Sequence, residues 1–521
     1  MSAITPDSYI KLVRFDVTKE HQITFSDAVA QVNFFRNQID GLVLNASSYQ
    51  RKDFKVRFPA VIDEIEHYNY MVVQNLPYNY TYYYYYITDM QYINDEMTEC
   101  TIKLDVFQTY QFSFHYLKSF VEREHVNSDI VGEHTIPESL ELGEYVVNSY
   151  DYFNGFENEC AILTATKPFN IATGEVRTSS TLINGITTCL YTYIALSQYD
   201  LMDLIGFYAE NPIATTDSIV DIYMIPRALV PDSVIDTWTY KGKTIREYSI
   251  SIAPIILNHI VSKPTSLNGY TPKNKKLLTF PFCFLVGSNN SGSSNVYHYE
   301  KFKSNNCEFS ISCAVTPGGS IKMTPYEYTE NHGYDEEEGL ICGKFPSIAW
   351  ITQGYEKWLT QNSLNLNGQV ATGLLATAYS AYSGDVGTLA TGILKITNVL
   401  QQVYQHSMTP NSAKGNTNGG DINYAQGYNT FFFYKKSIKS EYAKMIDDFF
   451  SMYGYKVNSL KVPNITGRRS WNYVKTIEAN VDSTSVPEKY LNEFKAMLNN
   501  GITFWHNPAT FMDYSQNNSI V

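Results

Sequence analysis

Apolar and polar residues alternate with a period of two along much of the first 120 residues. Phe54, Val56 and Phe58, for example, are separated by Lys55 and Arg57. This alternation is typical of a strand with one face on a core and the other in solvent. The pattern predicts successive short strands, separated by polar or turn-forming residues, over the ranges Tyr9–Phe15, Phe54–Phe58, Tyr70–Gln74, Tyr82–Ile87 and Thr101–Asp105.

The same strand-like pattern continues from about residue 143 to residue 347, where no long amphipathic helix is predicted. Loops rich in Ser, Asn and Gly interrupt it, which favours a β-dominated region. Helical spacing of apolar residues near the C-terminus predicts helices over Ser440–Met452 and Pro487–Leu498. Around these helices we expect strands at Asn429–Tyr434, from Gly454 onward, and at Gly501–His506.

Tyrosine is very abundant, with 43 residues, and phenylalanine adds 28. Aromatic residues favour a pleated, half-buried surface, so this composition strengthens the β prediction. Seven of the tyrosines lie in one stretch of nine residues; as a strand, it places Tyr82, Tyr84 and Tyr86 on one face and Tyr83 and Tyr85 on the other. We interpret this block as packing between sheets or subunits; the alternative is an aromatic binding platform.

Residues 360–427 differ from the rest of the chain in carrying very little charge. Between Trp358 and Ala413 the full charges are Asp385 and Lys395, and the composition turns to Ala, Gly, Thr, Ser and Leu. Two short apolar helices joined by a turn are predicted over residues 370–404, followed by a polar, Gly- and Asn-rich arm. The apolar residues that would enter a membrane are Val370, Leu374, Leu375, Val386, Leu389, Ile393, Leu394, Ile396, Val399, Leu400 and Val403.

The energetics of membrane insertion are marginal for one copy of this segment. Each of the eleven Val, Leu and Ile residues contributes about −0.3 to −0.6 kcal/mol, so the sum is roughly −5 kcal/mol. Asp385 and Lys395 would each cost about 2.5–3.5 kcal/mol at the bilayer centre, unless the hairpin tip carries Asp385 to the far interface. The insertion free energies of several copies held side by side would add up. A buried helical hairpin and a disordered loop are the alternatives.

Charge and cysteine content narrow the class of protein. The formal net charge of −13 argues against a protein that grips nucleic acid, and fits a channel wall past which DNA slides. Seven scattered cysteines without a C-x-x-C pair are expected to be reduced core thiols. The N-terminus lacks a signal peptide pattern, and no run of about 18 uncharged apolar residues occurs. We therefore expect a protein that is made as a soluble product in a cytoplasm.

Motifs for catalysis or cofactor binding are absent or incomplete. Residues 339–344 and 242–244 resemble parts of a phosphate-binding loop, but each lacks an essential residue, and there is no G-x-S-x-G or H-E-x-x-H. The densest polar cluster is Glu122-Arg123-Glu124-His125 with His134. A metal site or an acid/base pair is possible there; we favour a charged strand edge or an ion pair between subunits. No enzyme activity, cofactor or metal is predicted.

Four stretches, in order and widely spaced, resemble the tail knob or distal tail tube proteins of small short-tailed bacteriophages, the podoviruses with protein-primed replication. They frame nearly the whole chain, whereas residues 150–350 match loosely. The first stretch runs from Leu104–Tyr110 into Ser119–Val126, and the others are Gly132–Tyr145, Tyr453–Asn458 and Gly501–His506.

The resemblance implies a ring-forming, mainly β protein with barrel or sandwich domains like those of a tail tube and a few short helices. The implied parts are a tube domain at residues 1–145 and 429–521, a knob at 146–355, and a long hydrophobic loop at 356–428. It further implies a homohexamer in the virion tail that contacts the proximal tail tube or connector and a tail-tip protein. DNA passes through it, and its loops plug the tube before forming a pore in the host cytoplasmic membrane.

The sequence alone leaves two other functions open. The Ser-, Asn- and Gly-rich loops of residues 150–350 could make the protein an adhesin that binds the host wall. Less favoured is a peptidoglycan hydrolase, because no nucleophile or metal constellation is present and carboxylate pairs can be judged only in space.

Overall fold

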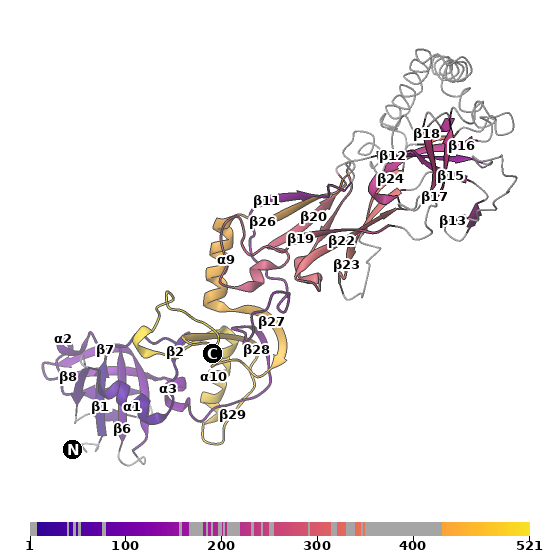
Figure 1. The fold of residues 1–521 in the computed structure, drawn as a ribbon. Helices are drawn as coiled ribbons and strands as arrows, with labels where there is room; N and C mark the ends of the chain where they lie inside the picture. The colour runs from indigo at the N-terminus through magenta and orange to yellow at the C-terminus, as the bar shows by residue number, and fades with distance from the viewer. Residues whose placement is uncertain are drawn as a thin grey trace, which may run out of the picture. The chain divides into compact units, whose positions relative to one another are not determined.

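The computed structural model describes most of the chain in several segments. The described residues are 8–38, 41–44, 48–50, 54–75, 80–155, 159–165, 181–183, 186–188, 191–195, 201, 204–205, 219–230, 234–240, 243–248, 255–289, 292–313, 320–329, 339–344, 347–349 and 430–521. The chain divides into two compact units (Figure 1). Unit 1 comprises residues 1–142, 272–277 and 441–521, and unit 2 comprises residues 143–271 and 278–440.

Unit 1 begins with an antiparallel sheet of seven strands in the order β3-β1-β6-β7-β8-β5-β4. The strands are β1 (Ser8–Val13), β3 (Gly41–Leu44), β4 (Ser48–Gln50), β5 (Lys55–Phe58), β6 (Tyr70–Asn75), β7 (Tyr82–Asn94) and β8 (Met97–Leu104). Both faces of this sheet are covered, so side chains of either parity along a strand find apolar neighbours.

Helix α1 (Ala28–Arg36) covers one face of the seven-stranded sheet. Its Phe35 is buried against Tyr70 and Tyr84, with ring centroids 5.7 and 5.0 Å away. The Asp27 carboxylate begins the helix by accepting a hydrogen bond from the Ala30 amide at 2.8 Å, which satisfies one of the free N–H groups of the first turn. Two short helices, α2 (Ile62–Ile65) and α3 (Val106–Tyr110), follow in this part of the chain.

The other face of the sheet packs against C-terminal elements. A large core joins residues of β1, β6 and β8 to Val474, Phe494 and Phe504. Phe494 lies on helix α10 (Glu488–Asn500), and its ring stacks on that of Phe114 at 4.1 Å. Gly501 ends α10 with a φ of +96°, a conformation that only glycine adopts without strain.

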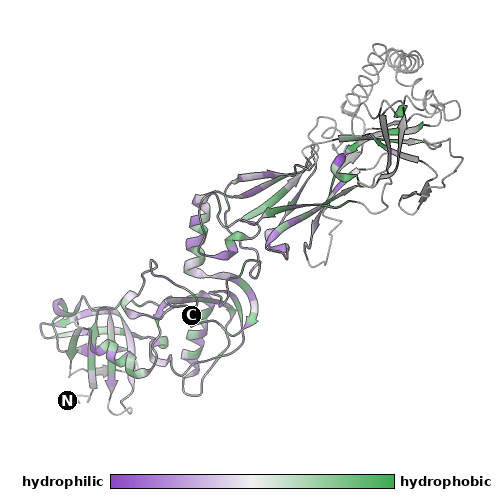
Figure 2. Ribbon diagram, in the orientation of Figure 1, coloured by the Kyte–Doolittle hydropathy of each residue, from purple (hydrophilic) through white to green (hydrophobic). Residues whose placement is uncertain are grey.

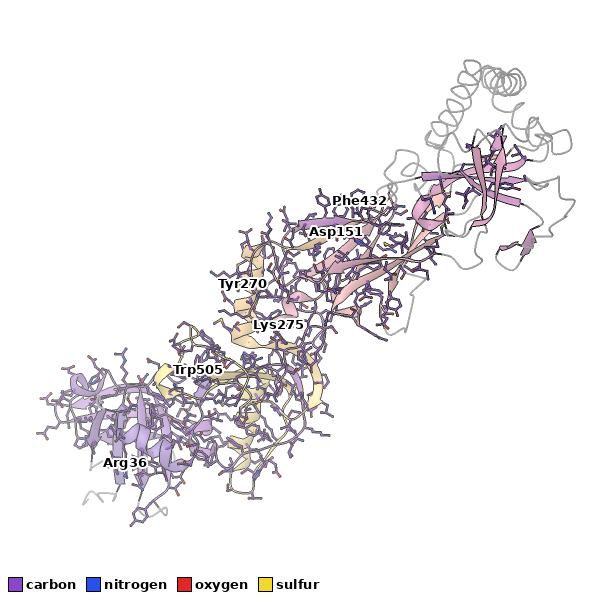
Figure 3. The ribbon with its side chains drawn as sticks, in the orientation of Figure 1. Arg36, Asp151, Tyr270, Lys275, Phe432 and Trp505 are labelled. Carbon is purple, nitrogen blue, oxygen red and sulfur yellow. The ribbon has the colours of Figure 1, made fainter. Side chains whose placement is uncertain are left out.

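A second sheet of unit 1 brings the two ends of the chain together, in the order β2-β30-β28-β10-β27. Its members are β2 (His21–Ile23), β10 (Ser119–Glu124), β27 (Tyr455–Lys461), β28 (Trp471–Glu478) and β30 (Ile502–Trp505). A small ladder pairs β9 (His115–Tyr116) with β29 (Val481–Asp482), and helix α9 (Ser440–Tyr453) precedes β27. Figure 3 labels Trp505 on β30, which is fully buried.

Unit 2 is built from antiparallel sheets. Four strands follow the order β11-β26-β20-β21, six the order β17-β18-β15-β12-β16-β25, and four the order β19-β22-β23-β24; β13 and β14 form a hairpin. Figure 2 shows apolar and polar residues mixed along strands of this unit such as β11, β26, β20 and β22. The bounds are β11 (Tyr145–Tyr152), β12 (Glu159–Ala165), β13 (Thr181–Ile183), β14 (Ile186–Thr188), β15 (Tyr191–Ala195), β16 (Ile219–Pro226), β17 (Val234–Tyr240), β18 (Lys243–Tyr248), β19 (Leu257–Ser262), β20 (Cys283–Ser288), β21 (Ser294–Tyr297), β22 (Asn306–Cys313), β23 (Ser320–Tyr326), β24 (Leu340–Lys344), β25 (Ser347–Ala349) and β26 (Phe432–Ile438).

The mainly β fold predicted from the sequence is confirmed. Five cysteines of the described core are buried thiols outside any disulfide, as expected: Cys100, Cys160, Cys283, Cys307 and Cys313. Burial raises the pKa of the Cys100 and Cys313 thiols to about 12, which keeps them protonated and unreactive at neutral pH.

Candidate functional site

The segment predicted to enter a membrane, with its apolar residues from Val370 to Val403, lies outside the described residues. Strands on either side of it are described. Strand β25 hydrogen-bonds to β16, and β26 lies between β11 and β20 in the four-stranded sheet. Within the part of the chain that the structure describes, no helix has the length and hydropathy needed to cross a bilayer.

Strand β26, which follows that segment in the sequence, is anchored by buried side chains. Its neighbour Phe431 is fully buried, and the Thr430 hydroxyl donates a hydrogen bond to the Phe153 carbonyl. Phe433 is also fully buried, and its ring lies 4.7 Å from the rings of both His259 and Phe309. The chain after residue 429 is therefore anchored in the core of unit 2 from its first described residues.

Strand β11 forms an exposed edge of the same sheet. Among the described strands it pairs with β26 alone, so one side of its backbone is not used by the ladder. Four large apolar or aromatic side chains on it are exposed: Tyr145, Val147, Tyr150 and Tyr152, of which Tyr150 is 65% exposed. Figure 3 labels Asp151 on β11 and Phe432 on β26; in the register of these strands Asp151 faces Phe433, and Phe432 faces Tyr152.

An edge strand with exposed aromatic residues is suited to contact with another protein. Its free N–H and C=O groups can pair with a further strand, and proteins without a partner usually protect such an edge. The sequence analysis missed this surface. Tyr145–Tyr152 has a strand-like composition, but exposure on both faces depends on what the sheet packs against, which the sequence does not reveal.

The polar cluster Glu122–His125 lies in the middle of the second sheet of unit 1. Strand β10, which carries Glu122, Arg123 and Glu124, is placed between β28 and β27. The expectation of a strand edge was therefore wrong. The ion pairs of these residues also form within the chain, so no second subunit is needed to explain them: Glu122–Lys475 at 2.9 Å, Arg123–Glu138, and Glu124–Lys461.

Glu138 is the centre of this network. Its carboxylate is buried and accepts hydrogen bonds from the Lys276 ammonium at 2.6 Å and the Lys456 amide at 2.9 Å, besides its ion pair with Arg123. Burial opposes ionisation of Glu138, but the hydrogen bond and charge of Lys276 outweigh it and lower the pKa of this carboxyl. Burial in turn lowers the pKa of Lys276, against the effect of Glu138.

The two histidines of the cluster form structural hydrogen bonds. His125 is buried; its Nδ1 accepts from the Tyr473 amide at 2.8 Å, and its Nε2 lies 3.1 Å from the Ser451 carbonyl oxygen. His134 Nε2 lies 2.8 Å from the Ser128 carbonyl oxygen. No three His, Cys, Asp or Glu side chains gather as a metal site within the described residues. The cluster thus fixes β10, and the metal-site alternative has no support.

The tyrosine block forms core on both faces of the seven-stranded sheet. Tyr84 packs in the cluster with Phe35, together with Tyr82 and Tyr86, whereas Tyr83 and Tyr85 pack in the cluster on the opposite face. The predicted alternation is confirmed. Because these rings are buried or half-buried, they do not form a binding platform.

Two protein-family models match the chain. The model for the C-terminal domain of the tail knob protein gp9 of Bacillus phage phi29 matches residues 237–519, more than half of the chain. The model for the N-terminus of the caudoviral major tail protein matches residues 8–115, which form the seven-stranded sheet and its first helices.

Individual proteins agree with these matches. The tail knob protein gp9 of Bacillus phage B103 is 22% identical over 574 residues, covering 95% of both chains. That of Bacillus phage phi29 is 22% identical over 563 residues, covering 92% of this chain and 93% of its own. The solved structure of the bacteriophage C1 tail knob protein, gp12, shares the fold: the TM-score is 0.68 at 15% identity, covering 99% of this chain and 100% of that one.

Proposed function

The chain belongs to the family of the phage tail knob protein gp9, and from this premise we propose that it forms a ring-shaped segment of the distal tail tube through which DNA leaves the virion. It is a structural component of a virion tail and not an enzyme, because its relatives are tail knob proteins. The peptidoglycan hydrolase is therefore no longer a candidate.

The proposal that DNA passes through the ring rests on one observation. The N-terminal part of this tail knob chain matches the major tail protein of tailed phages. A net charge of −13 supports passage of DNA without tight binding, since phosphates are repelled rather than held.

We infer that the ring is a homohexamer, with subunits meeting along the edge of unit 2 formed by β11. The exposed side chains Tyr145, Val147, Tyr150 and Tyr152 support this assignment, because tyrosine is enriched in protein interfaces. The unused backbone groups of β11 would pair with a strand of the neighbouring subunit. The other partners in this proposal are the proximal tail tube or connector and a tail-tip protein.

The hydrophobic loop is the second part of the proposal. Residues 356–428 would plug the tube before infection and then enter the host cytoplasmic membrane as a pore. Their low charge and eleven Val, Leu and Ile residues support this function. Six copies in one ring would sum the marginal insertion energy of a single copy, with hydrophobic burial supplying part of the driving force.

Ring formation is tested by electron microscopy and mass photometry of the full chain. Tyr150→Lys places a charge on the β11 edge without touching the core, so we expect folded protein that no longer forms rings. The matched control is Tyr92→Lys, an exposed tyrosine of β7 in unit 1, for which rings should persist. Rings that survive Tyr150→Lys contradict the β11 interface, and a wild-type chain that stays monomeric contradicts the ring.

A further inference from the structure

A cavity of about 520 Å³ lies within unit 1. The C-terminal segment Tyr514–Ser519 forms one wall. The other lining residues include His125 after β10, Asn274, Ser451 of α9, Arg468, and Trp471 at the start of β28. The volume is that of a pocket for a small organic ligand.

The walls of the cavity are fixed by hydrogen bonds. The Asn518 side chain accepts from the amides of Ser470 and Trp471, both at 3.0 Å, and donates to the Trp471 carbonyl at 2.9 Å. The Ser451 carbonyl accepts from the Trp471 indole at 3.1 Å and lies 3.1 Å from His125 Nε2. A ligand would therefore meet a preformed pocket, which lowers the entropic cost of binding.

The guanidinium of Arg468 is incompletely satisfied. Its Nη1 donates to the Asn518 carbonyl at 3.3 Å, but its Nε is buried and has no hydrogen-bond partner among the described residues. Burial lowers the pKa of Arg468, against the effect of the Asp129 carboxylate. Because this Nε has no accessible surface, a ligand in the cavity would meet the terminal nitrogens of the guanidinium instead.

The charges around the cavity favour an anion. No Asp or Glu lines it, although the chain has 52 acidic residues against 39 basic ones. Its second cation is Lys273, whose exposed ammonium makes no ion pair with a described residue. The carboxylates of Asp129 and Asp447 are not part of the lining; they accept hydrogen bonds from the Tyr455 hydroxyl at 2.6 Å and from the Lys273 amide at 2.7 Å. Burial lowers the pKa of His125 to about 3, so that ring stays neutral.

We propose that this cavity binds a small anion that carries hydroxyl groups, of the chemical class of a sugar phosphate. The planar fork of the Arg468 guanidinium suits phosphate oxygens, and Lys273 adds a second positive charge. Asn517 and Ser519 would supply an amide and a hydroxyl for the hydroxyls of such a ligand, whereas the Ser515 hydroxyl already donates to the Asp513 carboxylate at 2.6 Å. This proposal does not depend on the tube or the pore.

Calorimetric titration of the full chain with glucose 6-phosphate tests the proposal. We expect binding by the wild type, and a Kd weakened roughly tenfold or more by Arg468→Gln, the size expected when a charge-assisted hydrogen bond is lost. Arg469→Gln is the matched control: Arg469 is exposed, neighbours Arg468 in sequence, and does not line the cavity. This variant should bind as the wild type does.

Further titrations show which chemical groups of the ligand the cavity recognises. Lys273→Gln changes an exposed side chain, so it keeps the test valid if Arg468→Gln fails to fold, and we expect it to weaken binding too. Glucose without phosphate should not bind. Absence of glucose 6-phosphate binding at millimolar concentration overturns the proposal, and so does wild-type affinity in both the Lys273→Gln and the Arg468→Gln variant. Inorganic phosphate that binds as tightly as glucose 6-phosphate overturns the assignment of a hydroxyl-bearing ligand.

Discussion

The buried carboxylate of Glu138 in unit 1 is satisfied by partners far away in the sequence. The sequence analysis recognised Glu122–His125 as the densest polar cluster, because those residues are adjacent. It could not identify the partners of Glu138, since Lys276 is 138 residues away and Lys456 is 318 residues away. Such pairings are set by the sheet order, in which β10 joins two strands from the last quarter of the chain.

Glu138→Gln is predicted to destabilise unit 1 by about 3–5 kcal/mol, because it leaves the Lys276 ammonium buried without a counter-charge. Urea denaturation at pH 7, followed by tryptophan fluorescence, measures the change. Glu141→Gln is the control, since Glu141 is exposed, and its stability should match the wild type. Equal stability of the two variants would show that the Glu138 network contributes little.

Two buried histidines predict a loss of stability in mild acid. Burial lowers the pKa of His125 to about 3, with a contribution from Arg468, and that of His506 to about 4, both from an ordinary 6.5. The unfolded chain therefore binds more protons below pH 6.5. Stability is fully present above that pH and falls as the pH drops toward the folded-state values, by about 2 kcal/mol per histidine at pH 5.

Denaturation of His506→Gln at pH 7 and pH 5 checks this dependence. The two histidines together cause a difference in unfolding free energy between pH 7 and pH 5. In this variant that difference should be about half as large. His115→Gln serves as the control, because His115 is exposed on the short strand β9, and it should retain the wild-type difference. An unchanged pH dependence in His506→Gln would refute the assignment.

At the scale of helices and strands, the periodic pattern of apolar residues was sufficient to predict elements that bury one face. The helices predicted at Ser440–Met452 and Pro487–Leu498 correspond to α9 and α10, with ends shifted by one or two residues. Helix α1 was missed, because its nine residues are too few for a clear helical period and lie among strand-like segments. Strand β7 extends beyond the predicted Ile87 to Asn94, where hydrogen bonds to β8, not apolar alternation, maintain it.

The packing of α10 predicts a large effect of Phe494→Ala. Phe494 is fully buried and its ring lies within 6 Å of those of Phe107 and Phe114. Removing it leaves a cavity in the core and should cost about 3–5 kcal/mol. Asn492→Ala on the exposed side of the same helix is the control and should change stability by less than about 0.5 kcal/mol. Urea denaturation compares the two; similar midpoints would contradict this packing.

On the scale of the whole molecule, unit 1 is assembled from three separate parts of the chain. The resemblance to tail knob proteins suggested that the chain returns to its N-terminal strands, and β10, β28 and β30 do lie in one sheet. The precise division into tube, knob and loop stays a prediction. So does the interface at β11, because one chain alone does not reveal which of its exposed surfaces another copy covers.

The central claim, a tail-tip tube that delivers a membrane-active loop, is tested most directly by dye release from liposomes at acid and neutral pH. The intact protein is compared with a variant that lacks residues 361–427, after both have been confirmed as rings by microscopy. The account predicts leakage by the intact protein and none by the deletion variant. Absence of leakage from both, or equal leakage from both, would contradict a membrane function of the loop.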